Sequence, residues 1–499
     1  MKLSDLIKGI VIKRVTGNMD TDVLSVAYDS RHVTPGTLFV AIRGFKTDGH
    51  RYIMDAVSRG ASALIIEGET NGNVIPSVPI PVLTVSDSRE AIARVAINYY
   101  GDPSRKLKVI GVTGTNGKTT TTYLIRAILE GAGHRTGLIG TVSYAYGDKT
   151  FPSVHTTPEA MEFQGLLREM GDNRCEFVVT EVSSHALALK RVHGTEFSTA
   201  LFTNLTQDHL DFHADMENYF QAKALLFSGM TPGNRAIINS DDPYGRRLTG
   251  MTKGPVYTYG VDRESDIHAK DIRLSMDGLE FNAATPAGRI RIKSGLVGIY
   301  NVYNILGAIG AGLSCNIPLE KIAAGIASVS SIPGRFEKID SGMGFGVVVD
   351  YAHTEDALRL LLKAAAGFVE RKIITLFGCG GDRDRGKRPL MGKAAIELSD
   401  YVIVTSDNPR TENPQRIMDE IEAGVREAMR APVRRASGYK LILDRGTAIE
   451  EAVQMAKEGD LVVVAGKGHE CYQIIGNKKL HFDDREEIKK AIVQRKGTC

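Results

Sequence analysis

Three short apolar runs in the last third of this 499-residue chain each end in a polar loop that contains glycine or proline. Residues 372–377 precede GCGGDRDRGKRP, residues 401–405 precede SDNPRTENP, and residues 460–465 precede GKGHE. Such a pattern is typical of buried strands in a parallel α/β sheet. Ligands bind beyond the carboxyl ends of these strands, so the three loops together predict one shared pocket. Any one of them alone is equally well explained as an ordinary connection.

The length of the chain exceeds what a single hydrophobic core supports. Its texture predicts an α/β protein of three domains. Residues 1–100 contain short β-rich runs and form an N-terminal α/β domain. Residues 101–332 begin at a Gly-Asp-Pro linker and form a central ATPase-type domain with a parallel sheet. Residues 333–499 form a C-terminal Rossmann-like α/β domain.

Composition excludes several classes of protein. The net charge of +3 and the mixing of basic with acidic residues argue against a nucleic-acid partner. No apolar run approaches the ~18 to 20 residues of a membrane span, so no membrane association is expected. The five cysteines form no C-x-x-C pair, which favours a reducing, cytoplasmic location. We expect a monomer.

The stretch GVTGTNGKTT, residues 111–120, follows an apolar run and precedes a helical segment. Main-chain N–H groups in a glycine-rich turn before a helix bind phosphate oxygens. Lys118 would then contact the β- and γ-phosphates of ATP, and Thr119 would hold Mg²⁺. The spelling departs from the strict G-x-x-x-x-G-K-[ST] pattern at Val112. A glycine-rich turn with a solvated lysine is therefore the alternative interpretation.

The wording TGTNGKTT resembles the ATP-binding loop of the Mur ligases, ATP-dependent enzymes that form amide bonds in bacterial cell-wall synthesis. Other motifs occur in the order of that family, namely EVSSHAL (181–187), NLTQDHLDFH (204–213), YFQAKALLF (219–227), YNVYN (300–304), PGRFE (333–337) and VDYAHT (349–354). The segments DSRHVTPGTLFVAIRG (29–44) and DGH (48–50) are similar to the branch that adds the third residue of the stem peptide. The resemblance covers nearly the whole chain.

The resemblance implies ATP and Mg²⁺ as cofactors. It implies a carbamylated Lys223, in which a cation becomes a carboxylate-like metal ligand; from the residues alone Lys223 reads as a lysine on a buried face. The implied catalytic residues are Lys118, Glu181, His209 and Lys223, and the implied metal ligands are Thr119, Glu181, His209 and Lys223. The implied ATP contacts are Gly114, Thr115, Asn116, Gly117, Lys118, Thr119, Thr120, Asn301, Asn304, Arg335, Asp350 and His353.

The resemblance also implies two small-molecule substrates, a UDP-N-acetylmuramoyl-dipeptide and meso-2,6-diaminopimelate, with the UDP part bound by the N-terminal domain. Leu189 stands where some family members have glutamine, which removes one hydrogen bond. Turn or cap chemistry is the alternative for most of these positions. The implied contacts are Tyr28, Ser30, Phe45, Lys46, Thr47, His155, Thr156, Thr157, Ser183, Arg191, Arg383, Asp407, Asn408, Pro409, Arg410, Gly466 and Glu470.

The string DNPR, residues 407–410, resembles the signature of the diaminopimelate-adding branch. Diaminopimelate differs from lysine by a second carboxylate at its far end. A guanidinium binds a carboxylate through two parallel hydrogen bonds, and a buried unpaired arginine would penalise lysine. Arg410 is therefore the candidate for the distal carboxylate, with Glu470 suited to an ammonium. The lysine-adding sister ligase is the nearest alternative.

The implied reaction activates a D-glutamyl γ-carboxylate as an acyl phosphate, which the amino acid then attacks. Other classes match the sequence less well. A GTPase would carry N-K-x-D, whereas the nearest string, residues 477–480, lacks the carboxylate. A Rossmann dehydrogenase would have glycine where Arg383 stands. A folate-polyglutamylating ligase shares the ATP loop without the front domain, and a nucleotide-gated binding protein would not need three substrate loops.

Overall fold

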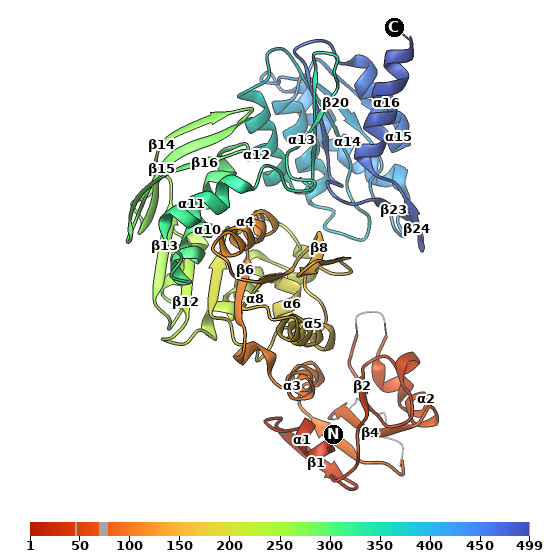
Figure 1. Ribbon diagram of the computed structural model, residues 1–499. Helices are drawn as coiled ribbons and strands as arrows, with labels where there is room; N and C mark the ends of the chain where they lie inside the picture. Colours follow the sequence, from red (N-terminus) through yellow and green to blue (C-terminus); the bar gives the residue numbers. More distant parts are fainter. Residues whose placement is uncertain (45–46, 69–77, 499) are drawn as a thin grey trace. The chain divides into compact units, whose positions relative to one another are not determined.

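The structure is a computed structural model that describes residues 1–44, 47–68 and 78–498 (Figure 1). The chain forms two compact units. The first unit comprises Met1–Gly111 and His134–Thr199, and the second comprises Val112–Gly133 and Ala200–Cys499. Both combine helices with largely parallel sheets, so the predicted α/β class is confirmed. The domain boundaries after residues 100 and 332 remain a prediction.

The N-terminal part of the first unit is a five-stranded sheet in the order β1-β5-β4-β3-β2, in which only β1 is antiparallel to its neighbour. Successive side chains of a strand point to opposite faces. Ala63 and Ile65 accordingly pack with helices α1 and α3, while Leu64 and Ile66 pack with α2. The elements are α1 (Leu3–Leu6), β1 (Ile12–Thr16), β2 (Ser25–Ala27), η1 (Ser30–His32), β3 (Thr37–Val40), η2 (Gly49–Tyr52), α2 (Ile53–Ser58), β4 (Ala61–Glu67), β5 (Val82–Val85), α3 (Ser88–Tyr100) and η3 (Pro103–Arg105).

Helix α3 shows how local sequence sets the limits of an element. The Asp87 side chain accepts hydrogen bonds from the N–H groups of Arg89 and Glu90, which satisfies donors that the first turn leaves open. At the other end Gly101 adopts a left-handed conformation with φ 75°, as is common just after a helix. The predicted linker at this glycine therefore coincides with a helix stop.

The rest of the first unit contains the strand order β6-β10-β7-β8-β9. Strands β10 and β7 are parallel, whereas β7, β8 and β9 form an antiparallel meander. Strand β6 continues across Gly111 into the second unit. The elements are β6 (Lys108–Thr113), β7 (Thr136–Ile139), β8 (Ser143–Tyr146), β9 (Lys149–Pro152), α5 (Ala160–Asp172), β10 (Phe177–Glu181) and α6 (Ser184–Ala188).

The first sheet of the second unit has the order β16-β15-β14-β13-β12-β11-β6. Strands β12 to β14 are parallel, but β14, β15 and β16 are joined by tight turns and run antiparallel, so the predicted parallel sheet is in fact mixed. No helix in the described parts of the chain is long and apolar enough to cross a membrane. The elements are α4 (Lys118–Gly131), β11 (Thr199–Phe202), α7 (Leu210–His213), α8 (Met216–Ser228), β12 (Arg235–Asn239), α9 (Pro243–Thr249), β13 (Val256–Gly260), β14 (Ile267–Ser275), β15 (Gly278–Thr285), β16 (Gly288–Ser294), α10 (Ile299–Ser314) and α11 (Leu319–Ser328).

The C-terminal sheet of the second unit has the order β17-β18-β22-β19-β20-β21, parallel except for β17. Helices α12, α13 and α14 cover one face and α15 and α16 the other. The strands before the three predicted loops, β19, β20 and β22, are parallel neighbours, which confirms their expected arrangement. The elements are β17 (Glu337–Asp340), β18 (Gly346–Asp350), α12 (Glu355–Ala366), β19 (Ile373–Phe377), α13 (Lys387–Leu398), β20 (Tyr401–Val404), α14 (Pro414–Arg430), β21 (Gly438–Leu441), α15 (Arg445–Met455), β22 (Leu461–Ala465), β23 (Tyr472–Ile475), β24 (Lys478–His481) and α16 (Asp484–Thr498).

Candidate functional site

The glycine-rich stretch forms a tight loop between β6 and α4, and α4 begins at Lys118. Two of its glycines are required by close contacts. At Gly114, with φ 147°, a Cβ would lie 1.8 Å from Thr203 Oγ1, and at Gly117, with φ 86°, it would lie 2.2 Å from Asn304 Oδ1. A strand, a glycine turn and a helix N-terminus therefore occur in the order that a phosphate-binding loop needs.

Two lysines donate hydrogen bonds to main-chain carbonyls of this loop. Lys118 Nζ lies 3.0 Å from the Gly114 oxygen and 2.8 Å from the Thr115 oxygen. Lys223, on α8, is only 1% exposed, and its Nζ donates to the same Gly114 oxygen at 2.8 Å. Burial lowers the pKa of Lys223 well below that of an ordinary lysine, and the charge of Lys118 adds to the effect. Lys118 and Lys223, both named from the sequence, therefore share the Gly114 carbonyl oxygen as an acceptor.

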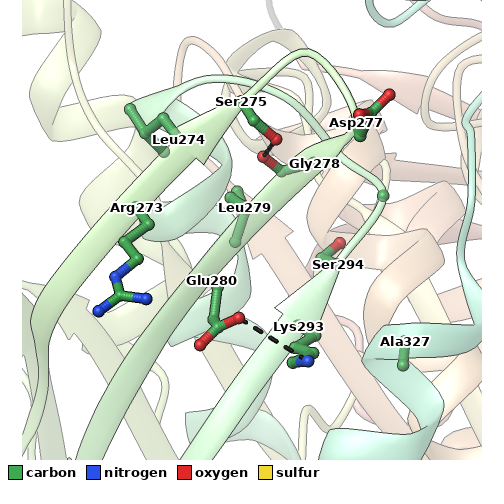
Figure 2. A pocket seen from close by; sticks show the side chains of 11 residues that line it. Arg273, Leu274, Ser275, Asp277, Gly278, Leu279, Glu280, Lys293, Ser294 and Ala327 are labelled. Atoms are coloured by element: carbon green, nitrogen blue, oxygen red, sulfur yellow. Dashed lines mark hydrogen bonds and ion pairs between the residues drawn. The ribbon is translucent and has the colours of Figure 1, made fainter.

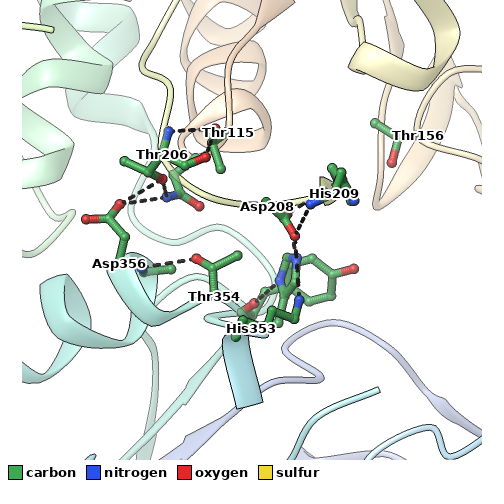
Figure 3. A network of polar contacts seen from close by, with 12 residues as sticks. Thr115, Thr156, Thr206, Asp208, His209, His353, Thr354 and Asp356 are labelled. Atoms are coloured by element: carbon green, nitrogen blue, oxygen red, sulfur yellow. Dashed lines mark hydrogen bonds and ion pairs between the residues drawn. The ribbon is translucent and has the colours of Figure 1, made fainter. Parts of the chain in front are cut away.

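Two residues that follow α11 in the sequence contact the phosphate loop, and Figure 3 shows the first of them. Asp356, in the first turn of α12, accepts hydrogen bonds from Asn116 Nδ2 at 3.0 Å and from Thr206 Oγ1 at 3.3 Å. Burial raises the pKa of the Asp356 carboxyl, against these two hydrogen bonds. Sequence reasoning missed Asp356, although it lies two residues after the motif VDYAHT. Its contacts show that α12 takes part in holding the loop.

Arg335 is the second such residue. Its guanidinium donates to Thr119 Oγ1 at 3.0 Å and lies over the Tyr351 ring, 4.7 Å from the ring centroid. Asp350 accepts hydrogen bonds from the N–H groups of Phe336 and Ala352, and burial raises its pKa. The predicted ATP contacts Arg335 and Asp350 thus lie at the same junction, with Asp350 holding the backbone beside Arg335.

The two asparagines of α10 form a buried ladder. Asn304 donates to Asn301 Oδ1 at 2.9 Å, and Asn301 donates to the Val297 oxygen at 2.8 Å. Asn304 Oδ1 accepts from Thr121 Oγ1 at 3.4 Å and faces Gly117. Their predicted contact with adenine remains a prediction, but their position beside the phosphate loop is clear.

Asp208 is a buried carboxylate surrounded by cationic and imidazole groups (Figure 3). Its oxygens lie 3.3 Å from His209 Nε2, 3.8 Å from His353 Nε2 and 3.6 Å from Lys387 Nζ. Burial alone would raise the pKa of Asp208, but these three neighbours hold it well below its ordinary value. Sequence reasoning named the two histidines and missed Asp208 and Lys387, although Asp208 immediately precedes His209.

A second polar cluster lies in the first unit, at the carboxyl ends of β7 and β10. The buried Glu181 carboxylate accepts hydrogen bonds from the main chain and hydroxyl of Thr141 at 2.8 and 2.9 Å. Thr157 Oγ1 donates to the main-chain carbonyl oxygen of Glu181 at 2.8 Å and accepts from the Ser183 N–H at 3.1 Å. Sequence reasoning missed Thr141. Its position just after the apolar run that ends at Ile139 could have indicated a residue at the carboxyl end of a strand.

Arg191 extends this cluster. Its guanidinium donates to the Thr157 oxygen at 3.0 Å and pairs with Glu159 at 2.7 Å. The predicted contacts Thr156, Thr157, Ser183 and Arg191 therefore belong to one network with Glu181. His155 lies at its border, where its main chain bonds the Tyr144 hydroxyl.

Among the predicted substrate contacts before residue 50, Tyr28 and Ser30 follow β2 in the sequence, and Thr47 precedes η2. The Tyr28 hydroxyl donates to Glu162 at 2.7 Å, and the buried Ser30 begins η1. Thr47 Oγ1 lies 3.1 Å from the Tyr52 hydroxyl. Phe45 and Lys46 lie outside the described residues. The roles of these five positions in substrate binding remain predictions.

The three loops of the C-terminal sheet bring charged groups together. Arg410 donates to the Gly381 oxygen and Arg383 to the Asp382 oxygen, both at 2.8 Å. Burial lowers the pKa of Arg383, and the charge of Arg410 adds to this. Two cations thus share this end of the cluster, without a carboxylate among these hydrogen-bond partners.

Carboxylates occupy the other side of the same loops. Glu470 accepts from Asn408 Nδ2 at 2.8 Å, and the buried Lys467 Nζ lies 3.3 Å from Glu470 and 3.6 Å from Asp407. Burial and the charge of Asp407 raise the pKa of Glu470, while Lys467 opposes the change. Gly466, with φ 112°, lets the backbone pass Asp407 closely. Sequence reasoning missed Lys467.

A cavity of about 410 Å³ lies away from all of these residues (Figure 2). It is formed by β14, β15 and β16 together with Ala327 of α11, and its charged lining residues are Arg273, Asp277, Glu280 and Lys293. Glu280 lies 3.9 Å from Lys293. Since no sequence-predicted site residue lines this cavity, the polar contacts above, and not the cavity, define the candidate site.

Comparisons with known proteins agree with this arrangement of a phosphate loop and substrate loops on α/β domains. Models of the "Mur ligase family, catalytic domain", the "Mur ligase middle domain" and the "Mur ligase, glutamate ligase domain" match residues 22–100, 112–312 and 334–468. Fold and site define a nucleotide-binding ligase. The chain belongs to the Mur ligase family.

Individual relatives cover the chain almost completely. UDP-N-acetylmuramoyl-L-alanyl-D-glutamate--2,6-diaminopimelate ligase of Geobacillus thermodenitrificans is 45% identical over 99% of this chain and 100% of its own length. The enzyme of the same name from Clostridioides difficile is 46% identical over 97% of this chain and 98% of its own. A solved structure of a ligase with this name has 31% identity, a TM-score of 0.68 and 99% coverage of both chains. The Thermotoga maritima MurF ligase, solved with ADP, shares the fold, with 19% identity, a TM-score of 0.63 and 95% and 99% coverage.

Proposed function

We propose that this ligase uses ATP to join meso-2,6-diaminopimelate to the D-glutamyl γ-carboxylate of UDP-N-acetylmuramoyl-L-alanyl-D-glutamate, a cytoplasmic step of peptidoglycan precursor synthesis. The names of relatives 45% identical over the full length support it. So does one observation on the chain itself: two arginines, Arg383 and Arg410, that donate to main-chain carbonyls, and two carboxylates, Asp407 and Glu470, that pair with Lys467, lie on the loops of neighbouring strands.

That arrangement suits the far end of diaminopimelate, which carries both an ammonium and a carboxylate. The guanidinium of Arg410 donates to a neutral carbonyl, so its further N–H groups suit the carboxylate. Asp407 and Glu470 together carry more negative charge than Lys467 neutralises, so they suit the ammonium. Lysine would supply the ammonium and leave the arginine without its anionic partner.

Catalysis begins with activation of the donor. A γ-carboxylate oxygen attacks the γ-phosphorus of ATP, the bond to the β-phosphate oxygen breaks, and ADP leaves. Lys118 lies at the start of α4, where its ammonium stabilises the charge of the transferring phosphoryl group. Arg335 contacts the same helix start through Thr119 and adds a second positive charge.

The amine of diaminopimelate then attacks the acyl carbon. The tetrahedral intermediate expels phosphate, the nitrogen loses a proton, and an amide remains. Water competes with the amine at this stage, so exclusion of water from the acyl phosphate is required. Asp407, Asn408, Pro409, Arg410, Gly466 and Glu470 hold the attacking molecule in this proposal.

The metal in the proposal is Mg²⁺, held by Thr119, Glu181, His209 and Lys223. Mg²⁺ would neutralise the developing phosphate charge. The carboxylate and hydroxyl oxygens of this set match the preference of Mg²⁺ for oxygen ligands. The lowered pKa of Lys223 favours its uncharged amine, which is the form that reacts with CO₂ to give a carbamate. A carbamate would supply the further oxygen ligand.

The test is phosphate release by the purified enzyme with ATP, the UDP-dipeptide and either diaminopimelate or lysine. Wild type is expected to use diaminopimelate in strong preference. Arg410→Ala should lose most of that preference, with kcat/KM for diaminopimelate about 10²-fold lower, because a buried anionic partner is left unpaired. Arg385→Ala, which removes an arginine with a 60% exposed side chain from the neighbouring loop after β19, is the matched control. Equal use of both amino acids by wild type would contradict the substrate assignment and favour the lysine-adding alternative.

A further inference from the structure

Thr141 occupies a position that neither the sequence motifs nor the proposed mechanism uses. Strand β7 ends at Ile139, which is paired with Thr180 of the parallel neighbouring strand β10. Residues 140–141 and Glu181 therefore leave adjacent strands at the same edge of the sheet, where parallel α/β sheets bind their ligands.

Gly140 and Thr141 form a clamp around the Glu181 carboxylate. The Thr141 N–H donates to Oε1 at 2.8 Å, and the Thr141 hydroxyl donates to Oε2 at 2.9 Å. A Cβ at position 140 would lie 2.6 Å from Oε1, so only glycine permits this approach. Because one residue holds both oxygens, the plane of the buried carboxylate is fixed.

The direction of these hydrogen bonds orients a third side chain. A threonine hydroxyl has one hydrogen, and Thr141 donates its hydrogen to Glu181. Thr156 Oγ1 lies 3.0 Å from Thr141 Oγ1, so in this contact Thr156 must be the donor. The single hydrogen of Thr156 is thereby used, and only its lone pairs are left for another partner.

We propose that Thr141 is a positioning residue that fixes the Glu181 carboxylate and turns the Thr156 hydroxyl into an acceptor for an N–H or O–H group of the donor substrate. This inference rests on the proposed function, in which Glu181 holds Mg²⁺ and Thr156 contacts the UDP-dipeptide. That substrate offers both kinds of donor, as amide N–H groups and sugar hydroxyls. A carboxylate or phosphate oxygen of the substrate would not be recognised by Thr156.

The first experiment measures Mn²⁺ affinity by electron paramagnetic resonance in the presence of ADP, so that no turnover is needed. Thr141→Val keeps the shape and removes the hydroxyl, and should weaken Mn²⁺ binding about tenfold, the usual scale for a group that orients a metal ligand. Thr141→Ser keeps the hydroxyl and should stay within about twofold. Thr136→Val, on the same strand and with its hydroxyl bonded to the His134 oxygen, is the matched control and should bind Mn²⁺ as wild type does.

The second experiment measures KM for the UDP-dipeptide in a double-mutant cycle. Thr156→Val should raise this KM about tenfold, since the acceptor is lost. Adding Thr141→Val should raise it little further, because both changes remove the same oriented acceptor. A structural role for Thr141 would instead give increases that multiply.

Thermal unfolding first establishes that each variant is folded. If Thr141→Val does not fold, Gly140→Ala decides in its place, because its Cβ displaces Glu181 while the hydroxyl is kept; it should weaken Mn²⁺ binding comparably. If the folded Thr141→Val protein, or the folded Gly140→Ala protein that replaces it, binds Mn²⁺ as tightly as wild type, the inference is wrong. The Mn²⁺ readout needs no diaminopimelate, so a failure of amide formation would count against the proposed function alone.

Discussion

Two loops of the second unit differ in the groups that contact their lysines. At the phosphate loop, Lys118 donates to main-chain carbonyls, which are neutral. In the loop after β22, Lys467 is fully buried between the carboxylates of Asp407 and Glu470. The phosphate loop therefore gives Lys118 carbonyl partners that a polyanion can replace, whereas ion pairs neutralise most of the charge in the second loop.

The difference teaches how each loop is suited to its ligand in the proposed function. ATP brings several negative charges, and an ammonium bonded to neutral carbonyls is suited to meet them. Diaminopimelate brings charges of both signs at one end, and a site with a small excess of each sign recognises them separately. Catalytic activity should therefore depend strongly on Lys118, and the stability of the fold should depend on Lys467.

The largest effect expected is on activity. Lys118→Met should lower kcat for amide formation roughly 10²- to 10³-fold, because the transferring phosphoryl group loses a preorganised cation. Its unfolding free energy should change by about 1 kcal/mol, the usual contribution of hydrogen bonds to neutral carbonyls. ADP release and urea unfolding measure the two quantities. A large loss of stability in Lys118→Met would contradict the proposed difference between the phosphate loop and the loop after β22.

Next in size is a change in stability at the second loop. Lys467→Met should lower the unfolding free energy by about 3 kcal/mol at pH 7, because Asp407 and Glu470 are left as a buried like-charged pair. Guanidinium unfolding of the variant and of wild type measures the difference. An unchanged midpoint would mean that the ion pairs around Lys467 do not stabilise the loop.

A smaller effect on stability is expected from the ion pairs of Arg388, which contact the loop after β20 and helix α14. The fully buried Arg388 donates to Glu412 and Glu420, and its hydrogen bond lowers the pKa of Glu412 from 4.5 to about 2. A carboxyl with a lowered pKa stabilises the fold fully above pH 4.5 and loses this contribution as the pH falls toward 2. Glu412→Gln should cost about 2 kcal/mol at pH 7, and its difference from wild type should shrink over that range.

Glu217→Gln provides the matched control for this measurement. Glu217 pairs with Arg247 at 2.7 Å, but both side chains are about half exposed. An exposed pair contributes less than about 1 kcal/mol, so the control should unfold nearly as wild type does at every pH. Equal losses for the two glutamines would show that burial of Arg388 is not what matters.

Much of the fold followed from the sequence because strands and loops left a clear pattern. The runs before GCGGDR, SDNPR and GKGHE became three adjacent parallel strands. The antiparallel meander of β14, β15 and β16 was not anticipated, since its direction depends on tight turns and on pairing between strands rather than on local hydrophobicity.

The candidate site was predictable where a motif carries its own chemistry, and less so where a residue acts through a neighbour. Lys118 and Lys223 were named and do meet at the phosphate loop. Asp208, Lys467 and Thr141 were missed because each also contacts a side chain distant in sequence, namely Lys387, Asp407 and Glu181. Such partners become visible only when the strand ends have been brought together in space.

The central claim is that the donor carboxylate is activated by phosphorylation. The most direct measurement labels both oxygens of the D-glutamyl γ-carboxylate with ¹⁸O and analyses the products of turnover with ATP and diaminopimelate by mass spectrometry. An acyl phosphate transfers one labelled oxygen to the released phosphate and leaves ADP unlabelled. Phosphate without ¹⁸O, released alongside the new amide, would contradict the account.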